Sequence, residues 1–217
     1  MIKVLVFDMD GTLIDSDDVI MQTWHELFRL YKPKDYFLDD KIVRTFSGPP
    51  LDKTLKKVFP ELDQKFILKE YSERTRKYYD TCLKPFPNVE ETLLKFKKDG
   101  YKLAILTSKN REMTLYSLKK VGLDQNIFDL IIGADEVTHH KPNPEGINRI
   151  MSNFGVKPNE VINIGDTEFD YGSGENAGVN TIMMTMKERN YESKIVPLSF
   201  CSSYNDLYKE IKEYDHK

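Results

Sequence analysis

Residues 2–12 read IKVLVFDMDGT, an apolar run of branched and aromatic residues that meets Asp8, Asp10 and Gly11 in quick succession. A short apolar run without alternation is typical of a strand that is buried on both faces. Two carboxylates follow as soon as the run ends, and the glycine after them permits a sharp turn. The stretch therefore predicts a buried strand that presents two carboxylates at its carboxyl end.

Four more apolar segments follow along the chain, and helical patterns separate them. The helical patterns begin near Val89, near Glu112 and at Asn143-Pro144, and each stops at a glycine, which tolerates the left-handed conformation that closes a last turn. Near-continuous apolar strands that alternate with helices indicate a parallel sheet covered on both faces. We therefore predict an α/β fold with a Rossmann-like, doubly wound parallel core. The further strands are expected at 103–106, 130–132, 161–164 and 181–184.

One interval breaks this rhythm. Residues 15–83 offer no convincing strand, and their apolar positions recur with helical spacing. We predict a small helical cap over 15–83, inserted into a core formed by residues 1–14 and 84–217. Pro85-Phe86-Pro87 is interpreted as the hinge where the chain re-enters the core.

Composition excludes several classes of protein. The chain has 217 residues, 40% of them hydrophobic, and 32 basic against 35 acidic residues give a net charge of −3. This balance supplies no overall basic field for nucleic acid. No apolar run approaches the ~20 residues of a membrane span, and Cys82 and Cys201 lack metal-type spacing. We expect a cytoplasmic protein with reduced thiols that binds neither nucleic acid nor membrane.

Polar residues stand where the predicted strands end, and in an open α/β sheet ligands bind at that edge. Carboxylates gathered there repel one another unless a cation lies among them, and oxygen ligands suit Mg²⁺. Lys141, in a proline turn, is expected to hold a carboxylate and a substrate phosphate together. The residues expected at this edge are Asp8, Asp10, Thr107, Ser108, Lys141, Asp166 and Asp170.

Together these segments resemble the four motifs of the haloacid dehalogenase (HAD) superfamily of phosphohydrolases. The matching residues are Asp8-x-Asp10-Gly11-Thr12, an apolar strand ending in Thr107, Lys141-Pro142, and Gly165-Asp166-xxx-Asp170. The resemblance covers essentially the whole chain, including the helical cap. It implies that Asp8 is a nucleophile that forms an aspartyl-phosphate. It implies that Asp10 protonates the leaving oxygen and later deprotonates the attacking water.

The same resemblance implies a ligand set. Mg²⁺ would be held by Asp8, by the Asp10 carbonyl and by Asp166, with Asp170 as a further ligand or next to one. The substrate would be held by Thr107, Ser108, Lys141, Gly11 and Gly48.

Within the superfamily, residues 48–51 and 174–178 are similar to phosphoglycolate-phosphatase-like and pyrophosphatase-like members. The expected activity is therefore hydrolysis of a small phosphomonoester, by a monomer or a homodimer, and we expect cap residues around Arg44, Gly48 and Lys53 to face the site. A sugar phosphomutase is an alternative, but mutases of this fold carry His and Arg where this chain has Ile20 and Leu51. A non-catalytic phosphate-binding protein is another alternative, although neither the nucleophile nor the lysine is lost.

Overall fold

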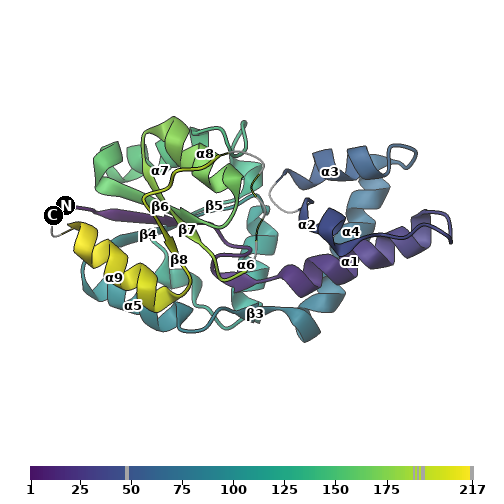
Figure 1. Ribbon diagram of the computed structural model, residues 1–217, viewed down its shortest axis with the longest axis horizontal. Helices are drawn as coiled ribbons and strands as arrows, with labels where there is room; N and C mark the ends of the chain where they lie inside the picture. Colours follow the sequence, from purple (N-terminus) through teal and green to yellow (C-terminus); the bar gives the residue numbers. More distant parts are fainter. Residues whose placement is uncertain (47–48, 188, 190, 192–193, 216–217) are drawn as a thin grey trace.

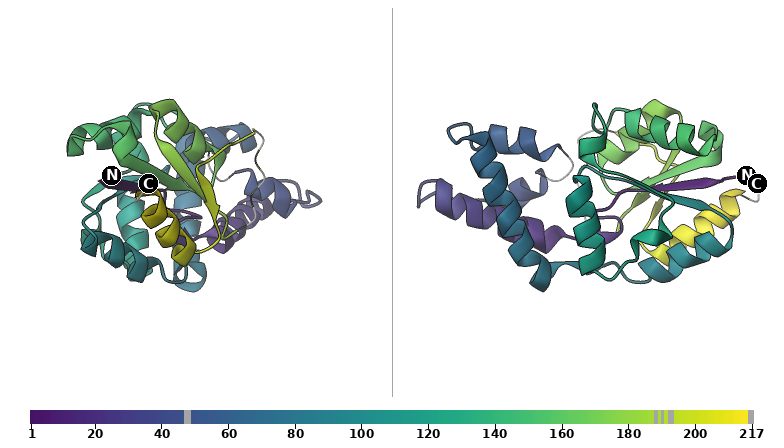
Figure 2. Two further views of the ribbon diagram at one scale, coloured as in Figure 1. Left: turned by 60° about the vertical axis from the view of Figure 1, so that its left-hand side comes forward. Right: turned by 180° about the vertical axis from the view of Figure 1, so that it is seen from behind.

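The computed structural model describes residues 1–46, 49–187, 189, 191 and 194–215. A parallel sheet flanked by helices forms one part of the molecule, and four helices form a second part beside it (Figure 1). The N-terminus and the last helix, α9 (Tyr204–Asp215), lie side by side at the end of the sheet part that is remote from those four helices (Figure 2).

Six strands of the described residues form one wholly parallel sheet in the order β5-β4-β1-β6-β7-β8. The chain starts at the central strand, moves outward on one side, and then returns to the other side of β1. A crevice outside the carboxyl ends of the strands, at such a reversal, is the place where open α/β sheets bind ligands. The strands are β1 (Val4–Phe7), β4 (Lys102–Leu106), β5 (Leu130–Ile132), β6 (Val161–Gly165), β7 (Asn180–Met184) and β8 (Ser199–Cys201).

The predicted α/β fold is confirmed, and each of the five expected segments contains a strand. β8 was not expected from the sequence; it has only three residues and lies at the edge of the sheet. Phe200 in its middle is 53% exposed, so β8 lacks the buried apolar run that marks the other strands.

Helices cover both faces of the sheet. On β1, Leu5 and Phe7 pack against the face covered by α5, α6 and α9, whereas Val4 and Val6 pack against the face covered by α7 and α8. This division follows from the alternation of side chains along a strand. The remaining helices of this part are α5 (Val89–Lys98), α6 (Arg111–Lys120), α7 (Glu145–Phe154) and α8 (Glu168–Ala177), with short 3-10 turns at Gln125–Ile127, Ala134–Glu136 and Pro158–Glu160.

The other four helices pack around a core of their own. Trp24 lies at its centre, with ring centroids 4.6 Å from Phe46 and 5.4 Å from Tyr71. The chain enters and leaves through two adjacent crossings, β2 (Ile14–Asp15) and β3 (Lys84–Pro85), which pair antiparallel. This arrangement supports the proposed cap over residues 15–83. The four helices are α1 (Asp17–Tyr31), α2 (Asp40–Arg44), α3 (Leu51–Val58) and α4 (Gln64–Cys82).

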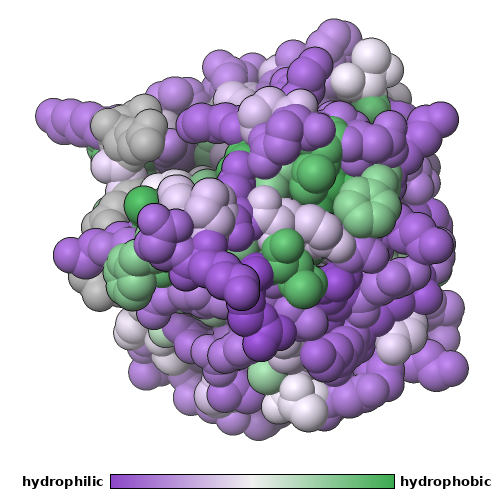
Figure 3. Space-filling model, turned by 90° about the vertical axis from the view of Figure 1, so that its right-hand side faces the viewer, coloured by the Kyte–Doolittle hydropathy of each residue, from purple (hydrophilic) through white to green (hydrophobic). Residues whose placement is uncertain are grey.

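The outer surface of this helical part is mainly hydrophilic, with small groups of hydrophobic side chains between the polar ones (Figure 3). None of the described helices is long and apolar enough to cross a membrane. Cys82 and Cys201 are both free thiols, and burial raises the pKa of Cys201 to about 11.

Candidate active site

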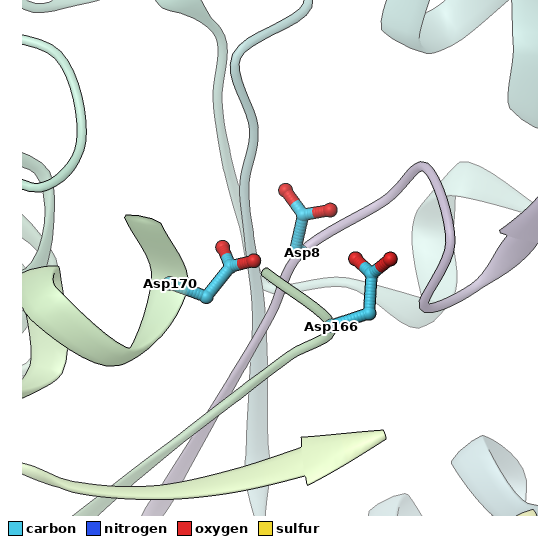
Figure 4. Close-up of side chains that lie close together, drawn as sticks. All are labelled: Asp8, Asp166 and Asp170. Atoms are coloured by element: carbon cyan, nitrogen blue, oxygen red, sulfur yellow. The ribbon is translucent and has the colours of Figure 1, made fainter. Parts of the chain in front are cut away.

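Three carboxylates from two neighbouring strands and one helix meet at the carboxyl edge of the sheet. Asp8 follows β1, Asp166 follows β6, and Asp170 lies in the first turn of α8. One oxygen atom of each lies within 4.8 Å of the others, and all three residues are buried. Figure 4 shows the three carboxylates gathered beside the ends of the two strands. The structure thus brings together three of the residues that the sequence placed at this edge.

Glycine is required where the chain passes this cluster. Gly11 has a φ of +83°, and a Cβ there would lie 2.1 Å from Asp166 Oδ2. At Gly165, a Cβ would lie 2.3 Å from Asp170 Cγ. The two glycines therefore let backbone pass directly beside the carboxylates, which no larger residue permits without displacing them.

Lys141 lies between two members of the cluster. Its Nζ donates to Asp8 Oδ1 at 2.7 Å and to Asp170 Oδ1 at 2.6 Å. Burial alone would lower the pKa of Lys141, but the negative charges of Asp170 and Asp8 raise it above its usual value. Lys141 is therefore a fixed positive charge beside the expected nucleophile.

A second basic residue, Arg189, follows β7 and was not predicted from the sequence. Its Nε donates to Asp166 Oδ2 at 2.7 Å, and its other guanidinium nitrogens donate to Asp17, the first residue of α1, at 2.9 and 3.0 Å. Burial raises the pKa of Asp166 to about 7, although Arg189 opposes that shift. Because β7 ends at the same edge as β1, the segment after it was the place to look for such a residue.

A third basic residue, Lys109, holds Asp10. Lys109 Nζ donates to Asp10 Oδ1 at 2.9 Å, to the Tyr79 hydroxyl at 3.0 Å and to Ser117 Oγ at 3.3 Å. Burial alone would lower the pKa of Lys109, but Asp10 and Tyr79 raise it. Since Tyr79 belongs to α4, this network joins Asp10 to the helical part. Lys109 directly follows Thr107 and Ser108 in the sequence, but no neighbouring residue or motif indicated that Asp10 is its partner.

A cavity of about 520 Å³ opens between the sheet edge and the four helices. Its lining includes seven of the sequence-predicted residues, namely Asp8, Asp10, Thr107, Ser108, Lys141, Asp166 and Asp170.

Gly11 is not among the described lining residues, and its N–H donates to the carbonyl of Ile14 at 2.8 Å. Gly48, expected at the substrate, lies outside the described residues. Of the cap residues expected to face the site, those next to Gly48 line the cavity, including Leu51 and Asp52. Arg44 and Lys53 are not among the described lining residues, and Arg44 Nη1 lies 3.3 Å from Asp17 Oδ2.

A divalent cation fits the three carboxylates. Burial raises the pKa of Asp8 well above its usual range; Lys141 lowers it, and the charges of Asp170 and Asp166 raise it again. A cation among these oxygens would stabilise their ionised forms. Buried carboxylate oxygens are also the ligands that Mg²⁺ prefers. The residues that could hold it are Asp8, Asp166 and Asp170.

Known proteins of one family resemble this chain over most of its length. The model of the haloacid dehalogenase-like hydrolases matches residues 5–184. Pyrophosphatase PpaX from Halalkalibacterium halodurans is 36% identical over 208 residues, which are 95% of each chain.

Two solved structures are similar along almost their whole length. A protein named as a haloacid dehalogenase-like hydrolase, from Bacteroides fragilis, has a TM-score of 0.83 and 26% identity over 95% of this chain and 100% of its own. A predicted phosphoglycolate phosphatase from Haemophilus somnus has a TM-score of 0.81 and 25% identity over 96% of this chain and 97% of its own.

Proposed function

Because this chain belongs to the haloacid dehalogenase-like hydrolases, we propose that it is a Mg²⁺-dependent phosphatase that passes the phosphoryl group of a small phosphomonoester first to Asp8 and then to water. One observation carries the proposal. Asp8 lies at the end of the central strand, in the cavity floor, with Lys141 Nζ at 2.7 Å and Asp10 two residues further on.

In the first step, a carboxylate oxygen of Asp8 attacks phosphorus, and the bond from phosphorus to the ester oxygen breaks. Asp10 gives its proton to that leaving oxygen. In the second step, Asp10 takes a proton from water, whose oxygen attacks the aspartyl-phosphate. Inorganic phosphate leaves, and the Asp8 carboxylate is restored. Two displacements thereby replace one difficult hydrolysis.

Positive charge and hydroxyl groups at the cavity floor support the transfer. Lys141 would donate hydrogen bonds to the phosphoryl oxygens while staying beside Asp8. Thr107 and Ser108, directly after β4, would donate to the same oxygens. Donors fixed before the reaction stabilise charge on phosphoryl oxygens without reorganisation.

Asp8, Asp166 and Asp170 would hold the metal ion. Bound there, Mg²⁺ would neutralise negative charge so that one anion can approach another. The positions that separate this chain from the mutases also favour hydrolysis. Ile20 and Leu51 both line the cavity. Because both side chains are aliphatic, they offer neither the imidazole nor the guanidinium group that mutases of this fold carry at these positions.

The test is phosphate release with Mg²⁺ over a panel of phosphomonoesters and pyrophosphate, the latter included because the relative from Halalkalibacterium halodurans is named a pyrophosphatase. When the reaction is quenched with acid, the trapped phosphorylated protein should carry its phosphoryl group on Asp8. Asp8→Asn keeps the shape but removes the nucleophile, and a loss of at least ~10⁴-fold is expected. Asp18→Asn, in α1, is the matched control. Full turnover by a folded Asp8→Asn protein would refute the assignment.

A further inference from the structure

The cavity has two chemically different walls. Its floor, from the sheet edge, carries the carboxylates and hydroxyls described above. The wall from the helical part is mostly apolar. Described residues of this wall that are aliphatic, aromatic or proline are Val19, Ile20, Phe46, Pro49, Pro50, Leu51, Leu68, Tyr71 and Tyr79.

No lysine or arginine among the described residues of that wall faces the cavity. The lysines and arginine in the described lining are Lys109, Lys141 and Arg189, and all three come from the sheet part. Each is already engaged by one or two aspartates. The charged residues that the helical wall does contribute are both acids, Asp17 and Asp52.

The charge balance of the described lining is strongly negative. Seven aspartates and three lysine or arginine residues line the cavity, a formal excess of four negative charges. A bound divalent cation and one phosphoryl group would cancel each other and leave that excess unchanged. A second anionic group on the substrate would therefore enter a negative field, without a free cation among the described residues of the helical wall to receive it.

The helical wall also exposes apolar surface into the cavity. Leu68 is 40% exposed although it is a large aliphatic side chain, and Phe46 and Leu51 are only partly buried. A ligand that covers exposed apolar surface inside a concave site removes that surface from water, which stabilises the complex. At about 520 Å³, the cavity falls in the ~300–1,000 Å³ range of pockets that hold organic ligands.

We propose that the substrate is an organic phosphomonoester whose leaving group has an apolar body and no second anionic group. The proposal rests on the phosphatase activity inferred above for the same site. It selects against pyrophosphate and against phosphorylated carboxylic acids. Leu68 is the residue assigned to contact the apolar body.

Three non-hydrolysable ligands test this directly, because they share a CH₂–PO₃ group and differ only in what it carries. Benzylphosphonate carries a phenyl ring, phosphonoacetate a carboxylate, and methylenediphosphonate a second phosphonate. Binding is measured by calorimetry at a fixed concentration of free Mg²⁺. Benzylphosphonate should bind about tenfold or more tightly than the two others.

Leu68→Lys places a cation on the helical wall and should shift that ratio by about tenfold toward the two ligands that carry a second anionic group. Leu94→Lys is the matched control, because Leu94 is an exposed leucine on α5, outside the lining residues. It should leave the ratio unchanged. Tighter binding of methylenediphosphonate or phosphonoacetate by the unmodified protein overturns the proposal. A ratio that Leu68→Lys does not move overturns the role of Leu68.

Turnover separates this proposal from the proposed function. If benzylphosphonate binds best but no phosphomonoester is hydrolysed, the description of the cavity stands and the phosphatase activity fails. If pyrophosphate is hydrolysed through Asp8 with a higher kcat/KM than phenyl phosphate, the activity stands and the substrate class is overturned.

Discussion

Lys109 Nζ lies 2.9 Å from Asp10 Oδ1, and the same nitrogen donates to the hydroxyl of Tyr79 on α4. The group proposed as general acid is thus fixed by a residue of the next strand end and by a helix of the other part of the molecule. The hydrogen bonds of Lys109 Nζ go to the side chains of Asp10, Tyr79 and Ser117 and not to the carboxylates of Asp8, Asp166 or Asp170, so we assign it a positioning role.

Replacing Lys109 by Met should lower kcat about 100-fold for an alkyl phosphate, because a misplaced Asp10 no longer protonates the leaving oxygen. The loss should be much smaller with p-nitrophenyl phosphate, whose leaving group departs without a proton. Lys109→Arg should recover part of the activity, and Lys98→Met, at an exposed position of α5, should have no effect. Equal losses with both substrates would contradict a role of Lys109 in placing Asp10 for protonation of the leaving oxygen.

Asp10→Asn should separate the two steps of the reaction. With p-nitrophenyl phosphate the first step needs no proton, so aspartyl-phosphate should form, whereas the second step lacks its base. Rapid mixing should therefore show a burst of up to one nitrophenolate per site, followed by slow turnover. Absence of a burst in a variant that binds Mg²⁺ normally would remove Asp10 from the acid and base roles.

Gly11 and Gly100 form a matched pair for measuring how much stability is lost when a Cβ is added. Both have a positive φ, but a Cβ at Gly100 meets no atom within 4 Å, whereas one at Gly11 meets Asp166 at 2.1 Å. Gly100→Ala should cost about 1 kcal/mol from backbone strain alone. Gly11→Ala should cost more than about 2 kcal/mol and weaken Mg²⁺ binding, because Asp166 has to move. Urea denaturation and calorimetry measure the two effects, and equal costs at both positions would contradict the close approach.

Glu145, at the start of α7, makes a pH-dependent contribution to stability. The backbone N–H groups of Thr138 and His139 donate to its carboxylate and lower its pKa to about 2. An ordinary glutamate has a pKa of about 4.3 in an unfolded chain. Since the pKa is lower in the folded protein, the stabilisation is fully present above the unfolded pKa of about 4.3 and is lost as pH falls toward 2.

Glu145→Gln should therefore lower stability at pH 6, and its difference from the unmodified protein should shrink steadily as the pH falls to 3. Urea denaturation at each pH gives the difference. Glu90→Gln, at an exposed position of α5, is the control and should show no such trend. A difference that stays constant between pH 6 and pH 3 would rule out this contribution.

Local patterns were enough to predict five of the six strands of the sheet and the polar residues that follow them. β1 is a continuous apolar run and β6 is apolar except for Asn163, so both were expected as buried strands, and the meeting of Asp8 with Asp166 at one edge followed from parallel topology. The partners of the basic residues did not follow. Lys109 meets Asp10 across 99 positions and Arg189 meets Asp17 across 172, and no spacing rule links residues so far apart.

The bonds of Arg189 to Asp166 and Asp17 have a thermodynamic consequence. A divalent cation at Asp166 would share that carboxylate with the guanidinium group of Arg189, and Asp17 begins the first helix of the other part of the molecule. Cation affinity and the placement of that helix are therefore linked quantities. Bound cation would change the equilibrium between the held and the released position of α1 by some factor. Reciprocity requires that release of α1 change the affinity for the cation by the same factor. The affinity of a divalent cation for this carboxylate cluster would therefore depend on how firmly α1 is held over the sheet edge.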